Sequence, residues 1–191
     1  MNSSKRSAIA LCVAVAIIIA CVAALPTVCR QYLRAIYPVA YSDSVLAAAA
    51  EYGIAPSLIY AVIHTESHFK TDARSSAGAK GLMQLTDSTF QWALKRAGHS
   101  GQYSTEDLYD PAVNIRYGVY VLSLFGERFE ETGTVLAAYN AGQGRVATWL
   151  KNPAYSADGK RLDNIPYKET RNYVQRVLLA QTLYQRLYEI S

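Results

Sequence analysis

The chain has 191 residues, of which 51% are hydrophobic and 18% are charged, and its 19 Lys and Arg exceed its 15 Asp and Glu to give a formal net charge of +4. The hydrophobic fraction is ample for a packed core, so the composition excludes a globally disordered chain. Lys and Arg are spread along the chain without a run, which argues against nucleic acid as a partner.

An apolar run occupies residues 8–28, without one charged side chain, and a run of this length can span a bilayer. Lys5 and Arg6 precede it, as in an export signal. The run is longer than the usual apolar core of a cleaved signal peptide, so we expect a retained membrane anchor. The alternatives are a lipoprotein processed at Cys21, because residues 18–21 look like a bacterial lipoprotein box, and a cleaved, secreted form.

The cysteines Cys12, Cys21 and Cys29 all lie in or beside the apolar run. The rest of the chain therefore has no disulfide and no thiolate metal site. His64 and His68 are four residues apart, but no Glu directly follows the first His, as the zinc-protease pattern requires. We expect neither a metal nor a cofactor.

We predict three segments: residues 1–29 as a membrane anchor or signal segment, 30–37 as a juxtamembrane linker, and 38–191 as one domain. Apolar residues of the domain recur at helical spacing and no alternating strand pair is evident, which predicts an all-α fold. Helices are expected at residues 44–52, 56–66, 86–96, 110–129, 134–140 and 145–150, and from 168 nearly to the C-terminus.

Glu66 occupies an unusual position in the second of these helices. Ile59, Val62 and Ile63 form an apolar stripe, and Glu66 takes the next position of the same stripe in the last turn. Burial and the negative end of the helix both disfavour an ionised carboxylate there. We therefore expect a raised pKa and a functional role, against the alternative that the helix has frayed and leaves Glu66 in water.

Four short motifs follow one another: Glu66-Ser67, Gly-Ala-Lys-Gly-Leu-Met-Gln-Leu at 78–85, Ala-Tyr-Asn-Ala-Gly at 138–142 and Glu-Thr-Arg-Asn-Tyr-Val at 169–174. Each motif alone is weak, but four in this order resemble the transglycosylase domain of the soluble lytic transglycosylase family. These are lysozyme-like enzymes that cut peptidoglycan. The resemblance covers the chain from about residue 41 to 187 and implies an all-α, lysozyme-like transglycosylase domain behind a single N-terminal transmembrane helix.

The resemblance also implies a chemistry and a substrate. Glu66 would be the only catalytic residue, acting as acid and then as base, and would cleave the MurNAc-GlcNAc β-1,4 bond without hydrolysis to leave a 1,6-anhydro-MurNAc end. The motif matches assign substrate binding to Ser67, Ser75, Met83, Gln84, Tyr139, Asn140, Glu169 and Tyr173. For Met83 the alternative is core filling, for Gln84 a solvated surface position, and for Tyr139 an ordinary aromatic at a helix end.

The chain departs from the family at Asp87, where many members have proline. A hydrolase on the same scaffold is one alternative, with Asp72 or Asp87 as the acid that activates water. A non-enzymatic wall-binding protein is another.

Peptidoglycan glycan strands and the cytoplasmic membrane are the expected partners. A wall-spanning apparatus would be a further partner, of unknown identity. Because peptidoglycan lies outside the cytoplasmic membrane, we expect a single-pass bacterial membrane protein with an extracytoplasmic catalytic domain.

Overall fold

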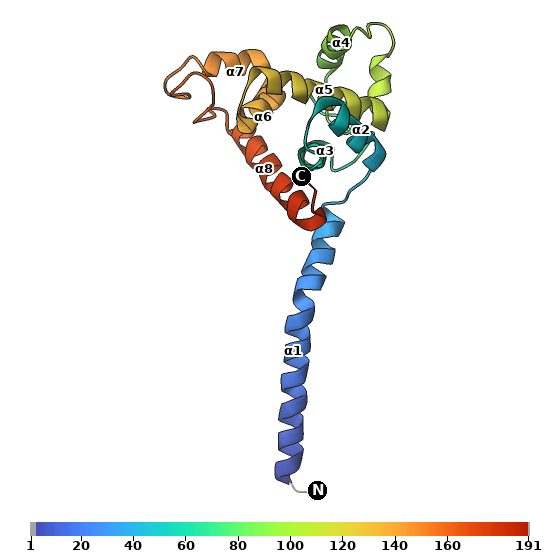
Figure 1. Cartoon of the computed structure of the whole chain (residues 1–191), viewed down its shortest axis with the longest axis vertical. Helices are drawn as coiled ribbons and strands as arrows, with labels where there is room; N and C mark the ends of the chain where they lie inside the picture. Colours follow the sequence, from blue (N-terminus) through green and yellow to red (C-terminus); the bar gives the residue numbers. More distant parts are fainter. Residues whose placement is uncertain (1–2, 191) are drawn as a thin grey trace. The chain divides into compact units, whose positions relative to one another are not determined.

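The computed structural model describes the backbone of residues 3–190 and the side chains of residue 11 and of residues 16–190. The chain divides into two compact units, one ending at Pro38 and the other beginning at Val39. In the described residues the regular structure is helical, apart from isolated bridges that join residues 74, 80 and 85 (Figure 1). The predicted all-α fold is confirmed.

The first unit is one helix, α1 (Ser3–Ile36). Its segment Ala16–Ile36 is long and apolar enough to cross a membrane. Side chains such as Ile18 and Val22 are exposed, as expected for a helix that lipid would surround. The helix continues through the predicted linker as far as Ile36. Residues 1–2, and the side chains of the first part of the apolar run with Cys12, lie outside the described part.

The second unit holds the remaining helices. They are α2 (Ser42–Tyr52), α3 (Pro56–Ser67), α4 (Asp87–Arg96), the 3-10 helix η1 (Thr105–Tyr109), α5 (Pro111–Arg128), α6 (Thr132–Ala141), α7 (Gln143–Trp149) and α8 (Lys168–Tyr188).

Side-chain caps explain where α4 and α5 begin. The Thr86 hydroxyl accepts a hydrogen bond from the Thr89 amide at 3.2 Å, and the Asp110 carboxylate accepts one from the Val113 amide at 2.9 Å. These caps satisfy amides that the first turn of a helix leaves without a partner. Both starts lie where the sequence predicts them.

Four local features differ from the sequence prediction, and one of them is α7, which begins at Gln143 rather than at residue 145. α2 begins at Ser42 rather than at residue 44, after Tyr41 in the left-handed conformation with φ 58°. α6 begins at Thr132, because the Glu131 carboxylate accepts hydrogen bonds from the amides of Gly133 and Thr134. The helix η1 was not predicted; its start is fixed by a capping box between Ser104 and Asp107.

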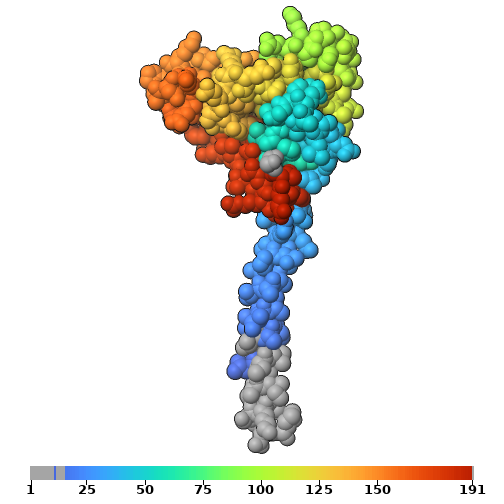
Figure 2. Space-filling model, in the orientation of Figure 1, coloured from blue at the N-terminus to red at the C-terminus, as the bar shows by residue number. Residues whose placement is uncertain are grey.

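The core surrounds α3. Ile59, Val62 and Ile63 have no exposed surface, which confirms the predicted stripe. α3 packs most extensively along α8, where Val177 and Tyr184 are also fully buried. Figure 2 shows the surfaces of these segments, cyan and red, adjoining on one face of the unit. The last turn of α3 thereby lies at the edge of the core.

Candidate active site

Glu66 lies in the last turn of α3, which ends at Ser67 with His68 as its left-handed cap (φ 50°). The helix therefore continues through Glu66 and does not fray before it. The side chain is only partly exposed, next to a stripe of fully buried residues.

Burial raises the pKa of Glu66 from 4.5 to about 7. Two groups on α8, the Tyr173 hydroxyl and the Arg176 guanidinium, partly oppose this shift. The Tyr173 hydroxyl is buried and lies close enough to Glu66 to lower its pKa, yet it makes no hydrogen bond of ordinary geometry within the described residues. A carboxyl with a pKa near 7 populates both protonation states at neutral pH, so it can donate a proton and later accept one.

The Glu66 side chain lines a cavity of about 350 Å³. Its walls come from the loop after α3 and from α4, α5, α6 and the first turn of α8. The lining residues are Glu66, Ser75, Ser76, Ala77, Ala79, Gln84, Leu85, Thr86, Thr89, Val121, Phe125, Ala138, Tyr139, Asn140, Gly142 and Glu169. Five of the eight predicted substrate-binding residues, Ser75, Gln84, Tyr139, Asn140 and Glu169, thus surround one space with Glu66.

Asn114 of α5 fixes the backbone of the motif loop at residues 78–85 by hydrogen bonds. The Asn114 Oδ1 accepts a hydrogen bond from the Met83 amide at 2.7 Å, and its Nδ2 donates to the carbonyls of Lys80 at 3.0 Å and Leu108 at 2.8 Å. Gly81 has φ 74°, and a Cβ there would collide with the Asn114 side chain and the Leu108 carbonyl. Only glycine fits this crossing.

Gln84 and Ser75 keep polar groups available on the loop side of the cavity. The Gln84 Nε2 donates to the carbonyls of Ala73 at 3.1 Å and Gly81 at 2.9 Å, which fixes the amide and leaves its Oε1 as an acceptor. The Ser75 Oγ accepts a hydrogen bond from the Ala79 amide at 3.0 Å, so its O–H remains a donor. One acceptor and one donor are therefore held in fixed positions.

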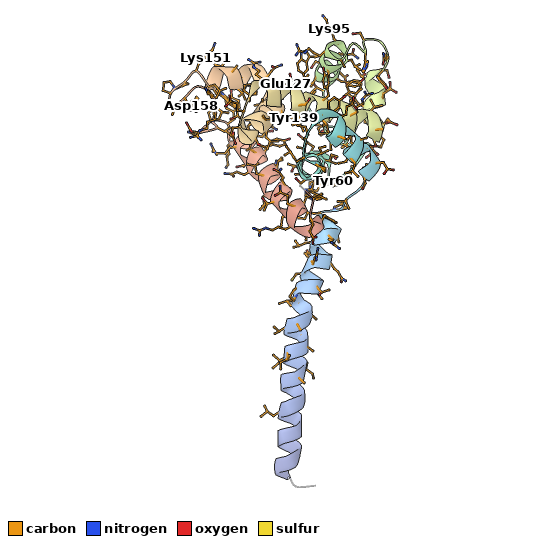
Figure 3. All side chains as sticks on the ribbon, viewed as in Figure 1. Tyr60, Lys95, Glu127, Tyr139, Lys151 and Asp158 are labelled. Atoms are coloured by element: carbon orange, nitrogen blue, oxygen red, sulfur yellow. The ribbon has the colours of Figure 1, made fainter. Side chains whose placement is uncertain are left out.

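The opposite wall comes from the end of α6. Tyr139, labelled in Figure 3, donates a hydrogen bond from its hydroxyl to the Met83 carbonyl at 2.8 Å. Burial, followed by the charge of Glu66, raises the pKa of Tyr139 well above its ordinary value, so it remains a neutral donor. The neighbouring Asn140 is exposed, and Gly142 ends the helix with φ 91°.

The other three predicted substrate-binding residues, Ser67, Met83 and Tyr173, lie behind the cavity. The Ser67 hydroxyl makes hydrogen bonds with the carbonyls of Ile63 at 3.1 Å and Leu82 at 2.8 Å, and is buried. The Met83 side chain has no exposed surface, and Tyr173 is 2% exposed. These side chains are buried, so they support the cavity wall and Glu66 instead of lining the substrate space.

Asp72 and Asp87 do not line the cavity. The Asp87 carboxylate pairs with the Lys80 ammonium at 3.1 Å, and Lys80 also pairs with Glu106 at 3.0 Å. Glu169 does line the cavity, from the exposed first turn of α8. Neither aspartate is therefore in place as the water-activating acid of the hydrolase alternative.

Sequence reasoning missed Asn114, Arg176 and the α5 residues Val121 and Phe125 of the cavity wall. Asn114 had a signal, because it is a polar residue directly before the buried Ile115 at the start of an apolar stripe. The other three had none, since they reach the site only through the packing of α5 and α8.

Comparisons with known proteins point to one family. A family model described as the transglycosylase SLT domain matches residues 43–162, and one described as the soluble lytic transglycosylase helical domain matches 164–190. The soluble lytic murein transglycosylase of Escherichia coli is 35% identical over 157 residues, covering 81% of this chain and 24% of that protein. A membrane-bound lytic murein transglycosylase C of Yersinia enterocolitica is 34% identical over 167 residues, covering 76% of this chain and 47% of that protein.

Solved structures show the same fold. An inactive mutant of the lytic transglycosylase Slt of Pseudomonas aeruginosa, with glutamate replaced by glutamine, superposes with a TM-score of 0.68 at 36% identity, covering 78% of this chain and 24% of that one. The 70-kDa soluble lytic transglycosylase in complex with bulgecin A gives a TM-score of 0.71 at 31% identity, covering 81% and 25%. The present chain spans about a quarter of the length of the first of these relatives. Sequence motifs, fold and comparisons lead to one conclusion: the chain belongs to the family of transglycosylase SLT domains.

Proposed function

We propose that this protein is a membrane-anchored lytic transglycosylase that cleaves the MurNAc-GlcNAc β-1,4 bond of peptidoglycan and leaves a 1,6-anhydro-MurNAc end. The observation that carries the proposal is Glu66, a carboxyl with a pKa of about 7 in the wall of a cavity lined by both polar and apolar side chains. The names of the relatives, which include lytic murein transglycosylases, support the substrate.

In the proposed reaction Glu66 acts twice. Protonated Glu66 donates to the glycosidic oxygen, and the bond from that oxygen to C1 of the muramic ring breaks. The muramic N-acetyl group stabilises the positive charge at C1. Glu66, now a carboxylate, takes the proton of the C6 hydroxyl, and O6 forms a bond to C1 of the same ring. The attack is intramolecular and so has a high effective concentration.

A single acid and base is consistent with the surroundings of Glu66. Glycoside hydrolysis normally requires a second carboxylate that acts as nucleophile or activates water. Asp72 and Asp87 lie outside the cavity lining, which leaves Glu169 as the other carboxylate there. Glu169 lies in the exposed first turn of α8, where a carboxylate is favoured by the helix dipole. We assign it to substrate orientation.

The remaining polar groups would bind the sugar. The Ser75 O–H can donate to, and the Gln84 Oε1 can accept from, hydroxyl or N-acetyl groups, since both atoms lack protein partners for these roles in the described residues. Asn140 supplies an exposed amide on the opposite wall. Tyr139, Ser67, Met83 and Tyr173 would act as positioning residues for this wall and for Glu66.

Membrane attachment is proposed from α1 and from the membrane-bound relatives. The helix would cross the cytoplasmic membrane once, with the catalytic unit outside. Extraction tests this: the full chain should stay in the membrane fraction in alkaline carbonate and be released by detergent. Release by carbonate alone would contradict a spanning helix. Lipid labelling that is lost on Cys21→Ser would instead establish a lipoprotein.

The reaction is tested by mass spectrometry of peptidoglycan digested with the full chain in detergent. Fragments one water lighter than muramidase products, with no reducing muramic end, are expected. Glu66→Gln should abolish them, whereas Asp72→Asn serves as a matched control that keeps them. Reducing muramic ends would establish hydrolysis instead and make Glu169 the candidate second acid.

A further inference from the structure

An open groove of about 670 Å³ lies on the surface between α4 and α5. Lys95 and Glu127, both labelled in Figure 3, contribute to its rim. This platform groove, as we call it, is lined by Trp92, Lys95, Arg96, Tyr120, Leu124 and Glu127. None of the four sequence motifs includes these residues, and the reaction proposed for Glu66 does not use them.

The platform groove adjoins the catalytic cavity through one pair of aromatic rings. Phe125 lines the catalytic cavity, and its ring stacks on Trp92 of the groove with centroids 6.0 Å apart and an interplanar angle of 28°. On α4, Thr89 lines the catalytic cavity and Trp92 lies one turn further along. From Thr89 to Arg96 the helix rises about 10 Å, which is enough for one or two sugar rings.

Trp92 presents both an apolar ring and a polar N–H group to a ligand in the groove. Phe125 is 6% exposed and stacks on one face of the indole, while Trp92 retains exposed surface in the groove. No hydrogen bond joins the indole N–H to another residue in the part of the chain that the structure describes. A pyranose ring presents C–H bonds that pack against the electron-rich face of an aromatic ring, and its hydroxyls accept hydrogen bonds.

The charges at the rim suit the same polymer. Lys95 and Arg96 are exposed and form no ion pair with another described residue. Such cations attract the carboxylates of the peptide stems that muramic residues carry. Glu127 on the facing helix limits the net positive charge, which disfavours polyanions such as nucleic acid.

We propose that the platform groove is a distal glycan subsite, in which Trp92 stacks on a sugar ring of the strand whose scissile bond lies at Glu66. This rests on the proposed function, because it takes peptidoglycan as the strand. It adds a residue that determines the preferred chain length of the substrate, outside the motifs of the family.

The test is binding to the full chain in detergent micelles with Glu66→Gln, so that no strand is cut. Trp149→Phe leaves Trp92 as the only tryptophan and therefore the only indole reporter. Peptide-free glycan strands of one to four disaccharides are the probes. We expect a change in Trp92 emission with the longer strands only, and an affinity for them about 3- to 10-fold higher than for one disaccharide.

Trp92→Leu, in a chain that keeps Trp149, removes the aromatic face of the side chain and keeps a smaller apolar one. It should abolish the gain in affinity with length, measured by calorimetry, and Trp92→Phe should restore most of it. Lys95→Ala should lower the affinity for peptide-bearing strands, because it removes a cation from the rim of the groove. Lys151→Ala removes a cation from a different cavity and is the matched control, which should leave this affinity unchanged. Unchanged emission, or equal affinity of Trp92→Leu and its parent for all lengths, overturns the proposal.

Kinetics separate this proposal from the function on which it rests. In the chain that keeps Glu66, Trp92→Leu should raise KM for long strands about 3- to 10-fold, with a smaller effect on kcat. A chain that binds strands with a Trp92 response but cuts none would refute the transglycosylase and leave the subsite standing. A chain that cuts strands normally but shows no change in Trp92 emission would refute the subsite and leave the transglycosylase standing.

Discussion

The Tyr139 hydroxyl and the Met83 carbonyl, 56 residues apart in the chain, share a 2.8 Å hydrogen bond that joins the two walls of the cavity. Met83 belongs to the motif loop, and Tyr139 to the end of α6. The same loop residue is held from the other side by Asn114 through its amide. Both polar groups of the Met83 backbone are thus used to fix the motif loop.

Tyr139→Phe removes this donor and leaves the Met83 carbonyl without its partner. We expect a loss of about 1–2 kcal/mol in the free energy of unfolding of the helical unit, because a buried acceptor loses its hydrogen bond. Urea unfolding followed by circular dichroism measures it. Tyr155→Phe is the control and should change little, because the Tyr155 hydroxyl has no hydrogen bond to another described residue. Equal stability of the two variants would mean that the bond to Met83 contributes nothing.

Glu66→Gln should stabilise the fold at high pH. The folded pKa of about 7 exceeds the ordinary 4.5, so between these values the folded state binds more protons and stability falls as pH rises. The loss of folding stability caused by ionising buried Glu66 is absent below about pH 4.5 and complete above about pH 7. A neutral amide avoids it, giving a gain of up to about 3 kcal/mol at pH 8 and almost none at pH 4. Urea titrations at both pH values measure the difference; a pH-independent difference would refute the raised pKa.

The pH profile of cleavage should follow the same carboxyl. If protonated Glu66 starts the reaction, kcat/KM falls about tenfold per pH unit above about pH 7. Tyr173 and Arg176 lower the pKa of Glu66, so Tyr173→Phe and Arg176→Gln should each move this limb to higher pH. A limb that stays in place in both variants would assign it to another group. Rates on soluble glycan strands across pH 5–9 provide the measurement.

Asn114→Asp should disrupt the motif loop. Aspartate keeps an acceptor for the Met83 amide but turns a carboxylate oxygen toward the carbonyls of Lys80 and Leu108. Since this buried site loses two hydrogen bonds and gains repulsion, we expect a loss of about 3 kcal/mol or more and greatly reduced activity. Thermal unfolding checks this against Asn164→Asp, an exposed control expected within about 0.5 kcal/mol of the parent.

Asp87→Asn separates the two chemistries that the scaffold allows. Asp87 forms an ion pair with Lys80, whose ammonium retains Glu106 as a second partner, so the fold should lose less than about 1 kcal/mol. Anhydro products and rates near those of the parent are expected, read by mass spectrometry. A large rate loss with the fold intact would return Asp87 to the reaction.

Helix phase made the position of Glu66 predictable. Residues 59, 62, 63 and 66 share one face at any α-helical geometry, so the stripe and the desolvated carboxyl follow from local spacing. The caps at Thr86 and Asp110 are equally local. The four motifs then identified the family, and the resemblance indicated which residues from distant segments of the chain come together at the site.

The side-chain directions in the motif loop could not be predicted in this way. Gln84 has φ 49° and Gly81 has φ 74°, so the loop reverses twice and sends Met83 into the core while Gln84 faces the cavity. Asn114, which decides this path, lies 31 residues from Met83 in sequence. Such pairings arise from tertiary packing and leave no periodic trace in the sequence.

The short connection after α1 limits where such an enzyme could work. Only residues 37–41 separate Ile36 from the start of α2, and five extended residues reach about 18 Å at most. A helix of 34 residues is about 51 Å long, against about 30 Å of hydrocarbon in a bilayer. With α1 in the membrane and peptidoglycan as substrate, as proposed above, the catalytic unit would reach only a few nanometres from the membrane surface and would process only the layer of wall nearest its own membrane.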